Sequence, residues 1–183
     1  MPVNVSLEFT PNPDTLKYTV NQQLIERGAE NFTDPVKVDR SPLARRLFAV
    51  EGVKAIMIGP TFVTVTVTGQ DKLMSVNTAM LKEIRQHLEA GEPVVTGPRS
   101  ESEHGADDSE VARKIIDILD QQVRPAVAQD GGDIVFHKFE SGTVYLQMRG
   151  SCSSCPSSVA TLKQGIETRL RELVPEVNEV VQI

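Results

Sequence analysis

The chain has 183 residues, of which 39% are hydrophobic, and a formal charge of −6. Its length suits two small domains, and its acidic balance predicts no nucleic-acid partner, because phosphate backbones are bound by clustered Lys and Arg. No apolar run reaches membrane-spanning length, and the first residues, MPVN, do not begin a signal peptide. We therefore expect a cytoplasmic protein without a membrane partner, or a mitochondrial matrix protein if a transit peptide has been removed.

Residues 1–91 are predicted to form a first α+β domain with the element order ββαββα. Its strands are expected, from apolar alternation and β-branched runs, over residues 3–9, 16–20, 53–58 and 62–68. Ser41 and Pro42 are typical of a helix start, with the hydroxyl as N-cap and proline at the first helical position. The second helix is expected over 71–90 and ends at Gly91.

Residues 92–106 contain Pro, Gly, Ser and Glu with little to bury, which predicts a flexible linker. Residues 107–183 are predicted to form a second α+β domain with the order αββαβ. Asp107 and Glu110 stand in the capping-box relation at the start of its first helix, and Pro125 is expected to end or kink that helix. The later elements are expected as strands over 134–139, 143–149 and 177–183 and as a helix over 156–173.

The two cysteines of the chain, Cys152 and Cys155, lie together in the sequence GSCSSCP at 150–156. Pro156 fits the first helical position, so Cys155 is expected near the N-cap, where free N–H groups and the helix dipole stabilise a thiolate. The small neighbouring residues leave both sulfurs uncrowded. We therefore predict an accessible, reactive thiol pair with lowered pKa values.

Thiolates are ligands of iron–sulfur clusters, zinc and copper(I), but one chain supplies two thiolates where four ligands are usual. A second copy of the chain, related by a two-fold axis, would complete a four-thiolate site. A dithiol–disulfide oxidoreductase and a zinc-bridged structural dimer are alternative interpretations of the same residues. A third is that the cysteines are simply buried as small apolar residues.

The other polar groups are interpreted structurally. Asp130 and Asp133 flank two glycines, a pattern typical of a turn and not of paired acid–base carboxylates. His87, His104 and His137 are scattered over a helix, the linker and a strand, and His137 is expected to face solvent. The histidines therefore do not supply the missing ligands.

Motifs along the whole chain resemble those of the NifU-like (Nfu) family. The second segment is similar to the carboxy-terminal NifU domain in RP at 124–125, DGGD at 130–133, VYL at 144–146, GSCSSCPSS at 150–158 and LKQGI at 162–166. The first segment resembles the Nfu amino-terminal domain in PNPDTLK at 11–17, SPLA at 41–44 and FAVEGV at 48–53.

The resemblance implies a carrier of iron–sulfur clusters that is not an enzyme. It implies that Cys152 and Cys155 bind a [4Fe-4S] cluster shared across a homodimer, and that the cluster is passed to apo-proteins. The implied partners are therefore a second copy of the chain, iron–sulfur assembly proteins and apo iron–sulfur recipients. The first domain contains no cysteine, and the resemblance suggests a role for it in target recognition or domain contact.

Overall fold

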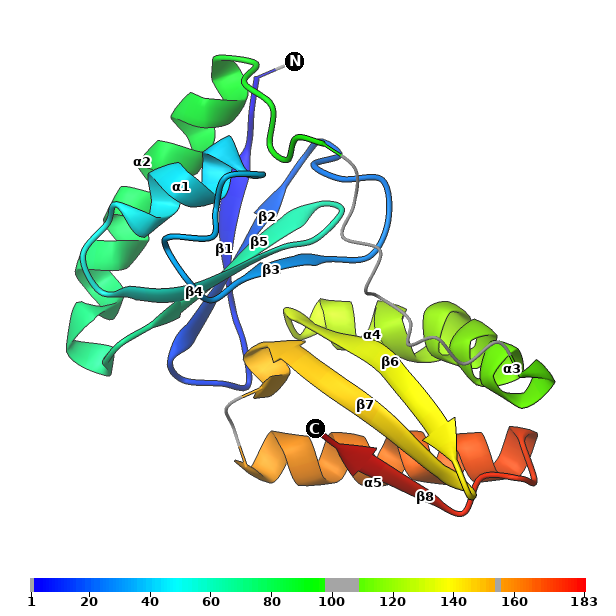
Figure 1. Cartoon of the computed structure of the whole chain (residues 1–183). Helices are drawn as coiled ribbons and strands as arrows, with labels where there is room; N and C mark the ends of the chain where they lie inside the picture. The colour runs from blue at the N-terminus through cyan, green and yellow to red at the C-terminus, as the bar shows by residue number, and fades with distance from the viewer. Residues whose placement is uncertain (1, 98–108, 154–155) are drawn as a thin grey trace. The chain divides into compact units, whose positions relative to one another are not determined.

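The computed structural model describes residues 2–97, 109–153 and 156–183 (Figure 1). The chain divides into two compact units, Met1–Pro98 and Arg99–Ile183. Each unit combines helices with a β-sheet, so the predicted α+β class is confirmed. No helix in the described ranges is both long and apolar enough to cross a membrane.

The first unit is built on a five-stranded sheet in which each strand pairing is antiparallel. In spatial order the strands are β1 (Val5–Phe9), β2 (Thr15–Val20), β5 (Phe62–Val67), β4 (Val53–Ile58) and β3 (Glu30–Phe32). The sequence predicted four of them and missed β3, because three residues are too few for an alternation pattern. Pairing with β4, from Glu30 opposite Ile58 to Phe32 opposite Ile56, forms this strand. The unit therefore reads βββαββα.

Helices α1 (Pro42–Phe48) and α2 (Leu73–Glu89) lie on one face of this sheet, with the short 3₁₀ turn η1 (Gln70–Lys72) leading into α2 (Figure 1). Ser41 caps α1 as predicted, and its Oγ accepts the Ala44 N–H at 3.0 Å. The helices and one sheet face bury a common core, which includes Leu16, Tyr18, Leu43, Leu47, Val63, Val65, Val76, Met80 and Ile84.

Residues 92–97, which the sequence assigns to the linker, pack on the first unit. Ser41 Oγ donates to Val94 O at 2.6 Å, and Thr96 N donates to Arg40 O at 2.6 Å. Val94 and Val95 also contact the hydrophobic core. This segment is therefore part of the first unit, and the rest of the predicted linker lies outside the described residues.

The second unit begins with three consecutive helical elements, α3 (Glu110–Ile118), a π turn η2 (Leu119–Val123) and α4 (Arg124–Gln129). Ser109 caps α3 by accepting the Ala112 N–H at 3.1 Å, so the predicted cap at Asp107 is wrong; Asp107 itself lies outside the described residues. The chain also stays helical through Pro125. The π turn makes this possible, because its wider turn joins Arg124 N–H to the carbonyl of Leu119 ahead of the proline.

A three-stranded sheet follows, with the spatial order β6 (Gly132–Glu140), β7 (Thr143–Gly150) and β8 (Glu179–Gln182). Ser141 and Gly142 both have positive φ, as the predicted tight hairpin requires. Helix α5 (Pro156–Leu173) connects β7 to the parallel strand β8. The helices and one face of the sheet share a core, which includes Ile115, Val127, Ile134, Phe136, Leu146, Met148, Ile166 and Leu170.

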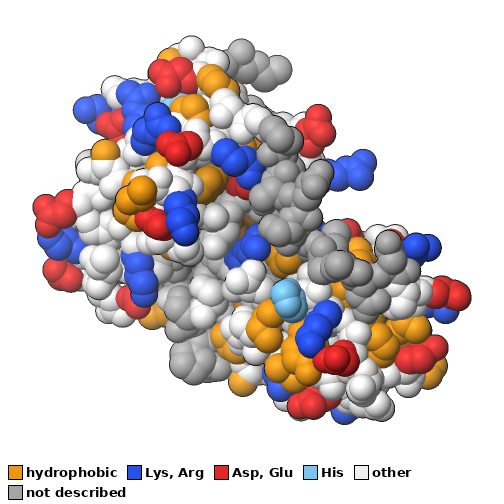
Figure 2. All heavy atoms as spheres, viewed as in Figure 1, with side chains coloured by type: hydrophobic (Ala, Val, Ile, Leu, Met, Phe, Trp, Pro, Cys, Tyr) orange, Lys and Arg blue, Asp and Glu red, His pale blue; other side chains and the backbone are white. Residues whose placement is uncertain are grey.

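The surface mixes charges of both signs. On the face shown in Figure 2, acidic and basic side chains are interspersed, with hydrophobic side chains between them. The large hydrophobic side chains exposed among the described residues are Phe9, Val36, Met74, Leu173 and Ile183. They come from separate places in the sequence, and single exposed hydrophobic residues are ordinary on protein surfaces.

Candidate functional site

The candidate site is the connection between β7 and α5. Strand β7 ends at Gly150, a 3₁₀ turn η3 spans Ser151–Ser153, and α5 begins at Pro156, as the sequence predicted. Cys152 occupies the middle of this turn. Cys155, the other predicted ligand, lies outside the described residues.

Cys152 is buried, with 6% of its surface exposed, and belongs to the hydrophobic core of the second unit. Its Sγ lies against the α-carbon of Gly132, where any side chain would overlap the sulfur. A Cβ at that position would also lie 3.1 Å from Cys152 Cβ and from Val127 Cγ1. The expectation of an accessible, uncrowded thiol is therefore wrong for Cys152 in this conformation.

The predicted lowering of the pKa is also wrong for Cys152. Burial raises the pKa of its thiol, because the thiolate would lose hydration. A hydrogen bond with Ser151 opposes this effect, and the negative charges of Asp130 and Asp133 add to it. The prediction fails because Cys152 lies in the turn before α5 and packs against the core. The cost of burying a thiolate there outweighs any stabilisation of the thiolate by the end of the helix.

The turn η3 is fixed to the preceding segment by Ser151, which is 2% exposed. Ser151 N donates to Gly131 O at 3.1 Å, and Ser151 Oγ donates to Asp130 O. Within the turn, Ser153 Oγ donates to Gly150 O at 2.8 Å. Gly131 has a φ of 74°, so a residue without a Cβ suits the turn that presents these carbonyls.

A buried ion pair supports the same segment. Arg124, on α4, donates to both carboxylate oxygens of Asp133, from Nε at 2.9 Å and from a terminal nitrogen at 3.0 Å. The side chains are 14% and 6% exposed. Burial alone disfavours the guanidinium charge, but the bonds to Asp133 and Asp120 outweigh it and raise the pKa of Arg124. The pair ties the start of β6, next to Gly132, to α4.

Sequence reasoning assigned Asp130 and Asp133 to a turn, which is correct for Asp130 and wrong for Asp133, a residue of β6. It also missed their connection to Arg124 and Ser151. The available signal was a charged pair of opposite sign, Arg124 and Asp133, on either side of one glycine turn in a segment with apolar flanks. The two opposite charges do not show how far apart the side chains lie, and no local sequence pattern predicts the contact of Gly132 with the sulfur of Cys152.

The histidines do not join the site. His87 is buried in α2, with Nε2 3.2 Å from Pro93 O, and His137 is exposed on β6 as expected. His104 lies outside the described residues. Within the described ranges, no three His, Cys, Asp or Glu side chains gather as a metal site.

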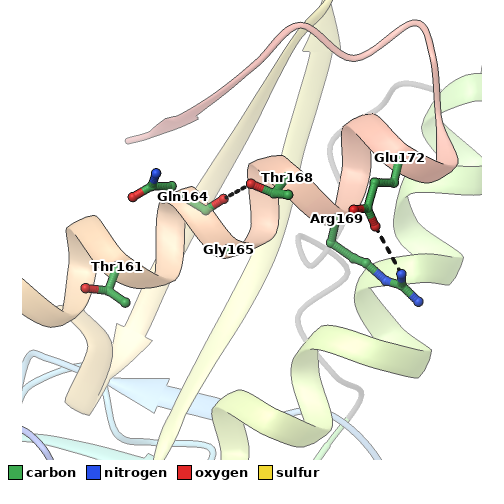
Figure 3. Close-up of a pocket in the computed structure, with 6 residues that line it drawn as sticks. All are labelled: Thr161, Gln164, Gly165, Thr168, Arg169 and Glu172. Carbon is green, nitrogen blue, oxygen red and sulfur yellow. Dashed lines mark hydrogen bonds and ion pairs between the residues drawn. The ribbon is translucent and has the colours of Figure 1, made fainter.

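A shallow groove of about 430 Å³ runs along the exposed side of α5 (Figure 3). It is lined by Thr161, Gln164, Gly165, Thr168, Arg169 and Glu172. Thr168 Oγ1 donates to Gln164 O at 2.9 Å, and Arg169 pairs with Glu172 at 3.2 Å and with Gln122 at 2.9 Å. Cys152 is not among the lining residues.

Family comparisons match both units. The model described as "NifU-like domain" matches residues 115–181, and the model described as "Scaffold protein Nfu/NifU N terminal" matches residues 5–91. The first match contains the whole of the candidate site.

Relatives match along almost the whole chain. The human protein named "NFU1 iron-sulfur cluster scaffold homolog, mitochondrial" is 39% identical over 181 residues, covering 98% of this chain and 71% of the human one. A protein of the same name from Drosophila persimilis is 37% identical, covering 98% of this chain and 64% of the fly protein. The solution structure of a NifU-like protein from Saccharomyces cerevisiae is 23% identical, with a TM-score of 0.45, over 53% of this chain and 87% of that one.

Proposed function

The chain belongs to the NifU-like (Nfu) family, and on this premise we propose that it is a carrier of iron–sulfur clusters. It binds a [4Fe-4S] cluster as cargo, through Cys152 and Cys155 of two copies of the chain, and passes it to apo-proteins. The chain performs no turnover chemistry of its own in this role. Its partners are a second copy, the iron–sulfur assembly proteins that supply the cluster and the recipients that take it.

The observation that supports this proposal is the position of the cysteines. The two cysteines of the chain lie inside the NifU-like match, and Cys152 stands between β7 and α5. The matched relatives are named for iron–sulfur cluster scaffolds. Thiolates are the usual protein ligands of such clusters.

Cysteine thiols are the right kind of ligand for an iron–sulfur cluster, but one chain has too few of them. Two thiols per chain are half of a four-thiolate set. Two copies related by a two-fold axis supply the full set, and each thiol releases its proton when its sulfur binds iron. A site shared between copies can also be taken apart again, which suits a carrier.

Anaerobic addition of iron and sulfide tests the proposal. The chain should gain broad absorption near ~400 nm, typical of thiolate-bound clusters, and its native mass should shift to that of a dimer. Cys152→Ser and Cys155→Ser should each lose both changes, while Ser153→Ala, a hydroxyl removed from the same turn, should keep them. A loaded chain that stays monomeric would contradict the shared site.

The same sample separates the alternatives. A zinc-bridged dimer would contain zinc and no sulfide after anaerobic isolation. A dithiol–disulfide oxidoreductase would reduce disulfides without iron and without colour. Iron and sulfide content per chain, measured with the native mass, therefore decides among the three.

We also propose that the cluster site belongs to the second unit alone. Cleavage near Ser102 should leave a carboxy-terminal fragment that still takes up iron and sulfide. A fragment that folds but does not load would make the first unit part of the site. The first unit is then left for the recognition of donors or recipients.

A reducing aqueous compartment suits a pair of free thiols. The relatives are named as mitochondrial proteins, which favours a mitochondrial location over the cytosol, and we propose the matrix. Fractionation of cells that express the tagged full-length protein would test this location.

A further inference from the structure

The buried position of Cys152 does not suit a sulfur that shares a cluster with another chain. Its Sγ lies against Gly132 and near Val127, within the core of the second unit. Thiolates from a second copy have to reach the same cluster, so each ligand sulfur has to lie at the surface of its own chain. The described conformation is therefore one in which Cys152 cannot yet take part.

We propose that Ser151 and Gly132 are positioning residues that hold Cys152 in a buried resting position, and that the turn η3 leaves this position before Cys152 binds iron. The inference rests on the proposed function, because it concerns the regulation of the same site. It adds a conformational step that separates an empty chain from a loaded one.

Hydrogen bonds and packing both hold the turn in its position. Ser151 donates from its backbone N–H to Gly131 O and from its hydroxyl to Asp130 O. Cys152 itself packs against Gly132 and Val127. A 3₁₀ turn of three residues adds little stability of its own, so it can open while the sheet and α5 stay folded.

The segment that receives the turn is better fixed than the turn itself. Asp133 is held by two hydrogen bonds from Arg124, and Gly132 pairs with Gly150 at the end of the β6–β7 ladder. Opening of the turn therefore moves Cys152 away from a segment that stays folded. Cys152 can then return to its position against that segment. The empty chain keeps this thiol away from oxidants and from disulfide exchange, because both attack exposed thiolates.

Alkylation of the full-length, iron-free chain tests the resting position. With iodoacetamide and peptide mass spectrometry, Cys152 should react at least about tenfold more slowly in the folded chain than in denaturant at the same pH, since core positions open rarely. Equal rates would overturn the proposal.

Ser151→Ala removes the side-chain bond and should speed the alkylation of Cys152 about fivefold, the factor that corresponds to one hydrogen bond of about 1 kcal/mol. The matched control is Ser153→Ala, which removes a hydroxyl bond from an exposed serine to Gly150 O at the end of β7 and none to the Asp130–Gly131 segment, and it should leave the rate unchanged. Equal rates in both variants would show that Ser151 does not hold the turn. Cluster loading of Ser151→Ala should be faster than in the wild type, with the same final iron content.

Gly132→Ala places a methyl group where the sulfur lies, and should bring the alkylation of Cys152 close to the rate in denaturant. Its control is Gly165→Ala, at a position of α5 with no atom within 4 Å of the added methyl. Circular dichroism checks that both variants fold. If Gly132→Ala does not fold, the Ser151→Ala comparison decides alone, and a folded Gly132→Ala with a slow Cys152 contradicts the role of Gly132.

Hydrogen exchange of the Ser151 amide links the step to loading. This N–H donates to Gly131 O in the resting position, so its exchange should become faster when iron and sulfide are bound. A wild-type chain that binds no iron but has a slowly alkylated Cys152 would contradict the proposed function and still support the buried resting position. A chain that loads iron while Cys152 is fully reactive when empty would remove the resting position instead.

Discussion

Each of the two units contains a buried serine hydroxyl bonded to a distant main-chain carbonyl, and the role of this hydroxyl differs between them. Ser41 in the first unit and Ser151 in the second are both almost fully buried, and each hydroxyl donates to a main-chain carbonyl of a distant segment. Ser41 also caps α1, so its hydrogen bonds join the start of this helix to residues 92–97. Ser151 holds the turn that carries Cys152. A buried hydroxyl thus stabilises a domain in one unit and, in the proposed resting position, holds a buried cysteine in the other.

The largest effect is expected in the second unit, from loss of the ion pair that supports the cysteine turn. Arg124→Met keeps the length of the side chain but leaves Asp133 buried without its cation, which should destabilise the second unit by about 3–5 kcal/mol. Hydrogen exchange of the β6 and β7 amides in the full chain measures this, because the two units need not unfold together.

The control for this variant is Arg46→Met in the first unit. Arg46 pairs with Glu83 at 2.8 Å, but the two side chains are 36% and 24% exposed, so the loss should be under about 1 kcal/mol. Equal losses from the two variants would mean that the burial of the Arg124 pair has no energetic weight.

The next largest effect on stability is expected at Ser41. Ser41→Ala removes the cap of α1 and the bond to Val94 O, and should destabilise the first unit by about 1–2 kcal/mol. The exchange of the Thr96 amide, which donates to Arg40 O, should rise with it. Ser75→Ala, which removes an exposed hydroxyl bond to Lys72 O, should stay within about 0.5 kcal/mol of the wild type.

A smaller effect of opposite sign is expected on α5. Gly165 lies in the middle of the helix and no neighbouring atom requires a glycine there, so Gly165→Ala should stabilise the second unit by about 0.5–1 kcal/mol. Thermal unfolding followed by calorimetry measures the shift. A loss of stability, or a loss of dimer formation on loading, would show that the groove of Figure 3 needs an unfilled position.

The smallest effect is a pH dependence in the first unit. The hydrogen bond from Lys17 lowers the pKa of Glu8, so the pair stabilises the folded chain above the unfolded pKa of Glu8. That stability is lost as the pH falls through its folded pKa. Glu8 is 48% exposed, so the contribution should be under about 1 kcal/mol. Acid unfolding of Glu8→Gln should therefore be less steep than that of the wild type, and identical slopes would contradict the pairing.

Much of the fold could be predicted because its signals are local. Ser41 and Pro42 start α1, the apolar residues of Val53–Ile58 predict β4, and Pro156 starts α5, as the structure has them. Cap residues and helix-start prolines act within one turn of the chain, so a single sequence contains them in full.

The errors come from contacts between distant residues. Val94 and Val95 lie in a stretch whose composition is typical of a linker, yet they are partly buried and pack against the core of the first unit. Cys152 has small polar neighbours in the sequence, yet the glycine that receives its sulfur lies twenty positions earlier. Local composition cannot show either contact, since both depend on how the chain returns on itself.

The π turn at Leu119–Val123 has a consequence for insertions and deletions. A π turn holds one residue more than an α-helical turn, and one residue rotates a helix face by about 100°. A single deletion in this turn would therefore leave an ordinary α-helical turn and keep Arg124 facing Asp133, whereas a single insertion would turn α3 by about 100° out of phase with Arg124. The support of the cysteine turn is thus a matter of helical phase as well as of residue identity.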